Sequence, residues 1–347
     1  KKKKKKKNKT IEKWSNSCHH ELALDQRSLT SLEQVLEWTP GDELNRCSVA
    51  LKYSKWHNTS VSNVGQSCSS SAPPTRPLVC VCHDMAGGYH FDKWNQGYHY
   101  GFEQVQLNGV GQMPLEYTLH FWQYVDVFVY FSHDFITIPP KQWIDVAHRN
   151  QTMILGTLIT EHAKGSQLSY EISCDDEKRE KTVEKLVSMA EYYGFDGYFL
   201  NFESHLTPVE YYEDESNKEK AKEKSDKCCL AAKKLVEFVD LLTKALKRKL
   251  PHAKVLWYDS ISIFDGTVSW QSCLNDHGLS FFNICEFRLF FFFLRICIYC
   301  KCRIVIASIN VVHAYSGFFT DYHWGKEFPQ TSLDYCRNRK FFFFFFF

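Results

Sequence analysis

Hydrophobic positions from about Ser31 to Asn283 form short, nearly continuous apolar runs that alternate with stretches of helical period. Continuous apolar runs are typical of parallel strands that are covered on both faces. Their alternation with helical segments predicts successive βα units in an α/β fold. The runs predict strands at Leu78–Cys82, Tyr124–Ser132, Met153–Ile159, Phe195–Glu203, Lys254–Ser260 and Gly317–Trp324.

The segments between these runs differ in character. Apolar residues at i, i+3, i+4 and i+7 within Val183–Ala190 predict a helix with one buried face. The same pattern recurs in Leu235–Leu246 and stops at Pro251, which ends a helix. The charged run Glu213–Lys227 predicts a solvated helix extension or loop, and Ser54–Pro77 predicts a linker.

The number of successive βα units favours a (β/α)8 TIM barrel over a doubly wound sheet. After the first strand, His83–Tyr89 lacks the G-x-G-x-x-G spacing of a dinucleotide-binding turn and opens no helical pattern. A complete barrel would need two more strands after Lys340. The expectation is therefore an incomplete barrel with its last strands missing from this sequence.

Both ends of the sequence are homopolymers, Lys1–Lys7 and Phe341–Phe347. Translated poly-A and poly-T tracts would give these residues, and the alternative is a basic tail and a hydrophobic tail. An exposed run of seven Phe would be an aggregation hazard. We therefore expect residues 1–30 to be unstructured or artefactual and residues 341–347 to be an artefactual tail.

Residues 286–315 are apolar and β-branched without a helical period. Basic residues interrupt every window of the ~20 residues that a membrane span needs. Cys297, Cys300 and Cys302 lack the second ligand pair of a usual zinc site. Codon choices at Glu286 and Ser316 allow an intron with GT and AG ends, whose removal would join Cys285 to Gly317 through an Asp.

These features predict a division of the chain. Residues 31–285 would be the catalytic barrel segment and residues 286–315 a translated intron. Residues 316–340 would continue the barrel with strand six. A spliced transcript that keeps residues 286–315 in frame would contradict the intron hypothesis.

Composition and charge narrow the class of protein. The chain is 44% hydrophobic and 24% charged, as in a soluble globular protein with a core. A net charge of +2 gives no reason to expect nucleic acid or a membrane as partner. The 14 cysteines are scattered, and Lys1–Lys7 is followed by polar sequence, so free thiols in the cytosol are favoured over a secreted disulfide framework.

The predicted fourth strand ends in two polar residues. Asn201 and Glu203 are two positions apart, so both side chains point to one face of the strand, at the end where barrels place their chemistry. The alternative is a structural polar pair. One carboxylate beside one amide fits substrate-assisted glycoside cleavage, in which the 2-acetamido oxygen of the sugar attacks the anomeric carbon. Glu203 would protonate the leaving oxygen, with its carboxyl kept neutral by a partly apolar surround such as Phe202. Asn201 would hold the acetamide N–H.

The sequence resembles glycoside hydrolase family 85, the endo-β-N-acetylglucosaminidases that cleave the chitobiose core of N-glycans. Residues 285 and 317–324 also match the family's C-D-G-F-F-T-N-Y-N-W segment once the insert is removed. The other matching stretches are SLEQVLEW from Ser31, VCHDMAGGY from Val81, VDVFVYFSH from Val125, ITIPP from Ile136, AHR from Ala147, LGTLITE from Leu155, FDG from Phe195, LWYDS from Leu256 and SWQ from Ser269.

The resemblance implies a role for each site residue. Glu203 would be the general acid/base, Asn201 would orient the acetamide, and Tyr258 would support the oxazoline-like intermediate. Trp270 and Trp324 resemble aromatic platforms that stack on sugars, although a lone Trp is often a core residue. Residues at the ends of the first three strands would bind sugar hydroxyls, unless they are buried structural groups: His83, Asp84, His133 and Glu161.

The resemblance also implies N-glycans or free oligosaccharides as substrates, with no cofactor and no metal. The chain departs from the family at His162, where Trp is usual, and at Ser204, where Asn is usual. These changes bear on glycan preference more than on the reaction.

Two rival interpretations remain. A chitinase-like family 18 hydrolase would need Asp at Phe199 and Asn201, in the pattern D-G-x-D-x-D-x-E. A carbohydrate-binding pseudoenzyme or an inactive fragment is the other, and release of a glycan from a glycopeptide would distinguish it from the enzyme.

Overall fold

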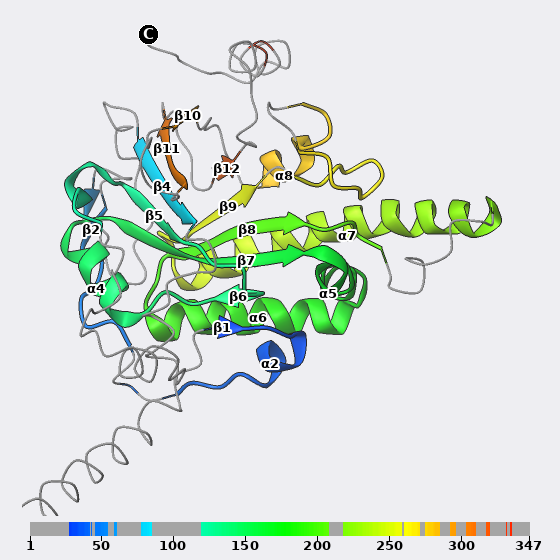
Figure 1. The fold of residues 1–347 in the computed structure, drawn as a ribbon. Helices are drawn as coiled ribbons and strands as arrows, with labels where there is room; N and C mark the ends of the chain where they lie inside the picture. Colours follow the sequence, from blue (N-terminus) through cyan, green and yellow to red (C-terminus); the bar gives the residue numbers. More distant parts are fainter. Residues whose placement is uncertain are drawn as a thin grey trace, which may run out of the picture.

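The computed structural model describes residues 28–41, 43, 46–54, 59–60, 78–84, 119–207, 218–258, 260–270, 275–284, 292–295, 303–309, 317–319, 331 and 334. They form an α/β fold around a mixed 10-stranded sheet, with helices packed along it (Figure 1).

The parallel part of the sheet follows the order of the chain. Neighbouring strands pair in parallel in the order β4 (Leu78–Asp84), β5 (Val127–Tyr130), β7 (Met153–Glu161), β8 (Gly197–Glu203), β9 (Lys254–Tyr258) and β12 (Gly317–Phe319). Each predicted strand overlaps an observed one, and residues 320–324 of the last prediction lie outside the described residues. β5 is shorter than predicted at both ends, because Tyr124 belongs to a 3-10 helix and pairing stops at Tyr130 instead of Ser132.

Further strands pair in antiparallel fashion. β11 (Arg303–Ile309) pairs with the outer edge of β4, and β10 (Phe292–Arg295) pairs with β11. These two strands lie in the segment predicted to be a translated intron, which stays a prediction. The remaining short strands are β1 (Ser28–Leu29), β6 (Ile136–Thr137) and the separate pair β2 (Tyr53–Ser54) and β3 (Thr59–Ser60).

The helices begin and end at recognisable signals. Asp175 caps α6 (Asp176–Tyr193) by accepting from the Lys178 amide, and Gly194 ends it at φ +82°. α7 (Lys218–Lys249) includes much of the charged run, and its N-terminal half projects beyond the rest of the fold (Figure 1). The other helices are α2 (Leu32–Glu37), the 3-10 helix η4 (Trp122–Tyr124), α4 (Lys141–Arg149), α5 (His162–Cys174) and α8 (Leu279–Ile284).

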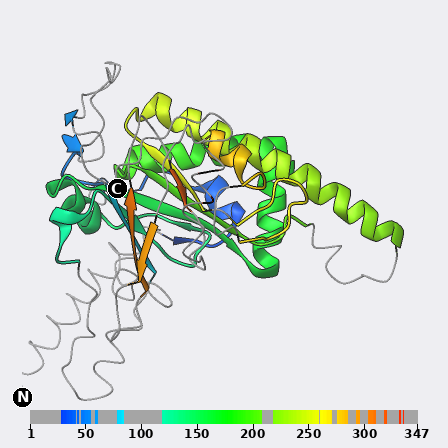
Figure 2. The same cartoon turned by 90° about the horizontal axis from the view of Figure 1, so that it is seen from above.

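The predicted buried faces are confirmed. Leu186 and Ala190 of α6, and Leu235 and Leu242 of α7, are fully buried. Both helices pack on β8: the hydroxyl of Tyr198 donates to the carbonyl oxygen of Leu186 in α6, and the ring of Phe202 lies against that of Phe238 in α7. Figures 1 and 2 show the helices beside the sheet. No helix in the described ranges is long and apolar enough to cross a membrane.

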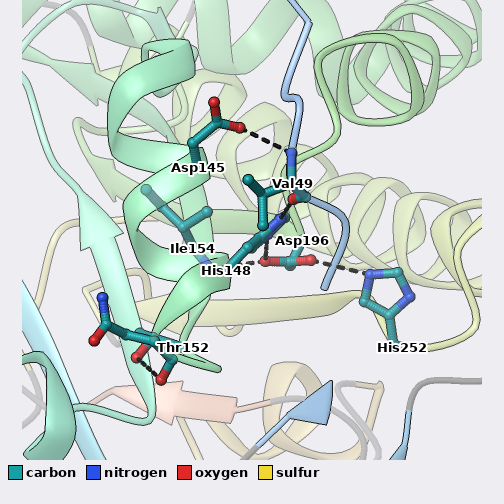
Figure 3. A network of polar contacts seen from close by, with 8 residues as sticks. Val49, Asp145, His148, Thr152, Ile154, Asp196 and His252 are labelled. Atoms are coloured by element: carbon teal, nitrogen blue, oxygen red, sulfur yellow. Dashed lines mark hydrogen bonds and ion pairs between the residues drawn. The ribbon is translucent and has the colours of Figure 1, made fainter. Parts of the chain in front are cut away.

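A buried ionic network holds the start of β8 (Figure 3). Asp196 binds Nε2 of His148 and Nε2 of His252, each at 3.0 Å, and accepts the Ile154 amide at 2.8 Å. Nδ1 of His148 lies 2.5 Å from the carbonyl oxygen of Val49. Both ring nitrogens of His148 therefore face acceptors, which requires the imidazolium form.

Charge pairing explains how this histidine stays protonated while buried. Burial alone disfavours the imidazolium, but the carboxylate of Asp196 overcomes it and raises the pKa of His148 to about 10. The network ties α4, β7 and β8 to the segment before β9. It thereby fixes the strands from the end opposite Asn201 and Glu203.

Candidate active site

Asn201 and Glu203 lie on one face at the carboxyl end of β8, as the alternation of side chains predicts. Nδ2 of Asn201 donates to Oε2 of Glu203 across 3.2 Å. The two groups therefore act as one unit and not as separate surface residues.

The amide of Asn201 has an unused acceptor. The residue is 4% exposed, and its Oδ1 is buried without a hydrogen-bond partner in the part of the chain that the structure describes. An unsatisfied buried amide oxygen is costly. Its nitrogen is already committed to Glu203, so the oxygen is the atom available to accept an N–H from a ligand.

Glu203 is bonded on both of its carboxyl oxygens. Its Oε1 accepts from Nε1 of Trp270 at 2.9 Å, while Oε2 accepts from Asn201. Burial raises the pKa of Glu203, and these two hydrogen bonds oppose the rise only in part. The result is a carboxyl group that keeps its proton to higher pH than an exposed glutamate does.

Trp270 is not a core residue. It is 56% exposed, although its indole N–H is bonded to Glu203. A ring face that is open to solvent beside an acid can stack on a sugar. The alternative that Trp270 is only a core ring is wrong.

A second carboxylate ends the neighbouring strand. Glu161 of β7 is the register partner of Glu203, and its Oε2 lies 2.9 Å from Nδ1 of His133. The chain brings His133 there by doubling back after β5: β6 pairs antiparallel with β7, and the Ile159 amide donates to the carbonyl oxygen of Phe135.

Aromatic rings lie below the polar groups. Phe199, two residues before Asn201 on the same face of β8, has its ring 6.2 Å from that of Tyr258 and 6.0 Å from that of Phe131. Phe202, which the sequence suggested as the apolar surround of Glu203, faces the opposite side. It packs on Phe238 and Trp257, because neighbouring residues of a strand point to opposite faces.

A cluster of buried hydroxyls lies behind the two carboxylates. Oγ of Ser169 donates to Oγ1 of Thr160 at 2.8 Å, and Oγ of Ser204 donates to the same atom at 3.1 Å. The cluster links the last residues of β7 and β8 to α5. The sequence pattern did not predict this cluster. Thr160 directly precedes Glu161, and Ser204 directly follows Glu203.

The structure brings most of the predicted site residues to one place. Glu203, Asn201, Trp270, Glu161 and His133 form a connected set, with Tyr258 beside Phe199. The backbones of His83 and Asp84 end β4 at the same edge of the sheet, and Trp324 and the side chains of His83 and Asp84 lie outside what the structure describes. The described residues include no group of three or more His, Cys, Asp or Glu that could hold a metal ion.

Comparisons with known proteins bear on this site. The family model described as glycosyl hydrolase family 85 matches residues 103–343. Cytosolic endo-beta-N-acetylglucosaminidase of Mus musculus is 31% identical over 303 residues, which are 87% of this chain and 31% of that protein. Cytosolic endo-beta-N-acetylglucosaminidase 2 of Arabidopsis thaliana is 32% identical over 273 residues, 79% of this chain and 30% of that protein.

A solved structure is also similar. The glycoside hydrolase domain of Endo-D from Streptococcus pneumoniae R6 has a TM-score of 0.48 and 19% identity, over 91% of this chain and 40% of that one. The chain spans about a third of the length of the curated relatives that it matches, 31% for the mouse protein.

Proposed function

Since the chain belongs to glycosyl hydrolase family 85, we propose that it carries the catalytic residues of an endo-β-N-acetylglucosaminidase. The proposed reaction is hydrolysis of the GlcNAc-β1,4-GlcNAc bond in the chitobiose core of N-glycans, on glycoproteins or on free oligosaccharides. Relatives that are named cytosolic endo-beta-N-acetylglucosaminidases support this activity.

The observation that carries the proposal is the pairing of Asn201 with Glu203. One side chain offers a buried amide oxygen without a partner, and the other offers a carboxyl group whose pKa is raised by burial. An acceptor for an acetamide N–H beside a proton donor is what substrate-assisted cleavage needs.

In the first step, Oδ1 of Asn201 accepts the N–H of the 2-acetamido group. This bond orients the acetamide and increases the electron density on its carbonyl oxygen, which attacks the anomeric carbon. Glu203 donates its proton to the glycosidic oxygen as the bond to the anomeric carbon breaks. The products of this step are an oxazolinium ion and the departed GlcNAc hydroxyl.

In the second step, Glu203 is a carboxylate and accepts a proton from water, whose oxygen attacks the anomeric carbon. The oxazoline ring opens, and the acetamide is restored with net retention of configuration. The hydrogen bonds from Asn201 and Trp270 stabilise this ionised form. Tyr258, buried below the site, would support the intermediate.

The parallel strands favour a (β/α)8 barrel as the architecture. β4, β5, β7, β8, β9 and β12 are neighbours in chain order, whereas a doubly wound sheet reverses its order at a switch point. β10 and β11 occupy the edge of β4, where the last strand of a closed barrel would pair. Barrel closure is therefore proposed for the natural protein.

We also propose a cytosolic location. The names of the relatives support it, as do free cysteines in the described part of the chain, among them Cys47, Cys80, Cys174, Cys228 and Cys229.

A high-mannose glycopeptide tests the proposed function. Mass spectrometry should find the peptide with one GlcNAc attached and a released glycan that ends in one GlcNAc. The Glu203→Gln variant should form both products about 10²- to 10⁴-fold more slowly. Binding of the glycopeptide without release would contradict the enzyme and favour a carbohydrate-binding protein.

A further inference from the structure

The end of the sheet holds two carboxyl groups side by side, and only one of them has a part in the proposed reaction. Glu161 and Glu203 are register partners on the parallel strands β7 and β8. Register partners of a parallel pair share a face and are separated by the strand spacing of about 4.8 Å. Substrate-assisted cleavage needs only the carboxyl group of Glu203, so it leaves Glu161 without a role.

Glu161 is held in place from its own strand. β7 ends at Glu161 and α5 begins at His162, so no loop separates them. His162 has φ +59°, a left-handed conformation that few non-glycine residues adopt. Gly165 brings the first turn of α5 against Thr160, since an added Cβ would lie 2.7 Å from its carbonyl carbon.

Glu161 is also paired with a side chain of the same protein. Its carboxylate binds the imidazole of His133, whose ring stands edge-on to Phe131 with centroids 5.4 Å apart. The side chains of His133 and Glu161 are 43% and 23% exposed, so solvent reaches the pair but does not surround it. This pairing holds the carboxylate of Glu161 at the end of β7, beside Glu203.

We propose that Glu161, held by His133, is a positioning residue that acts through Glu203. This inference rests on the proposed function. Its negative charge favours the protonated form of the acid before cleavage. His133 limits that effect, so that Glu203 can still ionise and serve as the base in the second step. This role is proposed in addition to the hydroxyl-binding role expected for Glu161 and His133.

The charges around Glu203 support this assignment. Burial raises the pKa of Glu203 most, the hydrogen bonds from Trp270 and Asn201 lower it, the charge of Glu161 raises it and that of His133 lowers it. Further titratable groups in the described ranges are Tyr258 at the end of β9, His205 after β8, the exposed His162 next to Glu161, and Asp134 next to His133. The carboxylate of Asp134 accepts from Oγ of Ser28. Nδ1 of His205 accepts the Val268 amide, and Tyr258 is buried.

Two substitutions with opposite expected signs test the proposal. Glu161→Gln removes the neighbouring negative charge, so the pKa of Glu203 should fall and the alkaline limb of kcat/KM should move to lower pH, on the order of one pH unit. His133→Gln removes the imidazole that pairs with Glu161 and lowers the pKa of Glu203, so the same limb should move to higher pH. Glu191→Gln is the matched control and should shift nothing, because Glu191 is an exposed carboxylate near the C-terminal end of α6 that forms an ion pair with Lys249.

A second measurement reads the coupling without turnover. Glutamate labelled with 13C at its carboxyl carbon is incorporated into the full chain, and the Glu203 signal is identified by its loss in Glu203→Gln. Titration by NMR should show the midpoint of Glu203 moving down in Glu161→Gln and up in His133→Gln.

The outcomes separate the inference from the function on which it rests. An unchanged titration midpoint of Glu203 in both variants would overturn the inference. A higher KM with an unchanged pH profile would also overturn it, because that result indicates that Glu161 and His133 bind the substrate directly. Shifted midpoints of the expected signs support it. If instead the glycopeptide is not cleaved by the unaltered chain, the proposed function fails while the NMR titration still tests the coupling.

Discussion

Nδ2 of Asn201 lies 3.2 Å from Oε2 of Glu203 and donates a hydrogen bond to it, from two residues earlier on the same strand. The bond fixes the orientation of the amide and turns Oδ1 away from the acid. A single contact thus relates the group proposed to hold the acetamide to the group proposed to move the proton. Changes to either residue should therefore affect the same step.

Glu203→Gln should reduce kcat on a glycopeptide by about 10²- to 10⁴-fold, because glutamine cannot donate a proton to the leaving oxygen. Steady-state release of glycan, measured by mass spectrometry, checks this. Retained turnover with a folded variant would exclude Glu203 as the acid.

Asn201→Ala should reduce hydrolysis by about 10²-fold or more, because the acetamide loses the acceptor that orients it. Asn201→Gln keeps the amide but displaces it by one methylene. It should weaken use of the acetamide while still accepting a preformed glycan oxazoline for transfer to a GlcNAc acceptor. An equal loss of activity with the intact glycan and with the preformed oxazoline would contradict the role assigned to Asn201.

Trp270→Phe keeps an aromatic ring but removes the N–H that donates to Glu203. Because that bond favours the carboxylate, its loss should raise the pKa of Glu203 and move the alkaline limb of kcat/KM to higher pH. Trp270→Ala should in addition raise KM by about tenfold through lost stacking. A pH–rate profile of each variant measures both effects. Identical profiles for the unaltered protein and both variants would show that the hydrogen bond from Trp270 does not affect the pKa of Glu203.

The strand pattern was enough to predict the place of the proposed acid. Alternation along β8 puts Asn201 and Glu203 on one face whatever the neighbouring strands are. The same rule should have placed Phe202 on the other face, so that error was avoidable. Predicting that β8 lies between β7 and β9 needed only the chain order of the βα units.

Contacts between distant segments were not predictable from the pattern. Trp270 and Glu203 are 67 residues apart, and their contact depends on the loop after β9 folding over the end of β8. His133 meets Glu161 only because β6 reverses the chain along β7. The pairing of β11 with β4 was also not predictable, because the apolar segment 286–315 carries no turn signals.

Stability should depend on pH through His148 and Asp196. Despite its burial, pairing with Asp196 raises the folded-state pKa of His148 to about 10, above the unfolded value of about 6.5. The stability that it contributes is therefore fully present below about pH 6.5 and is lost as pH rises through about 10. Urea unfolding followed by circular dichroism should show a free energy that falls across this range.

Asp196→Asn is expected to remove this dependence and to cost about 3 kcal/mol at pH 7, because it leaves the buried imidazolium without its charge partner. Asp240→Asn is the matched control. It breaks an exposed pair with Lys244 and should leave the unfolding midpoint nearly unchanged. A midpoint of Asp196→Asn equal to that of the unaltered protein would argue against the network as an anchor of β8.

The dependence of the rate on the acetamide itself tests the central claim most directly. Glycan substrates whose reacting GlcNAc carries mono-, di- or trifluoroacetamide in place of acetamide have a progressively weaker carbonyl nucleophile. If the sugar attacks its own anomeric carbon, kcat should fall steeply with each added fluorine. A kcat that is insensitive to fluorination, together with a covalent glycosyl-enzyme in the mass spectrum, would show that a protein carboxylate is the nucleophile.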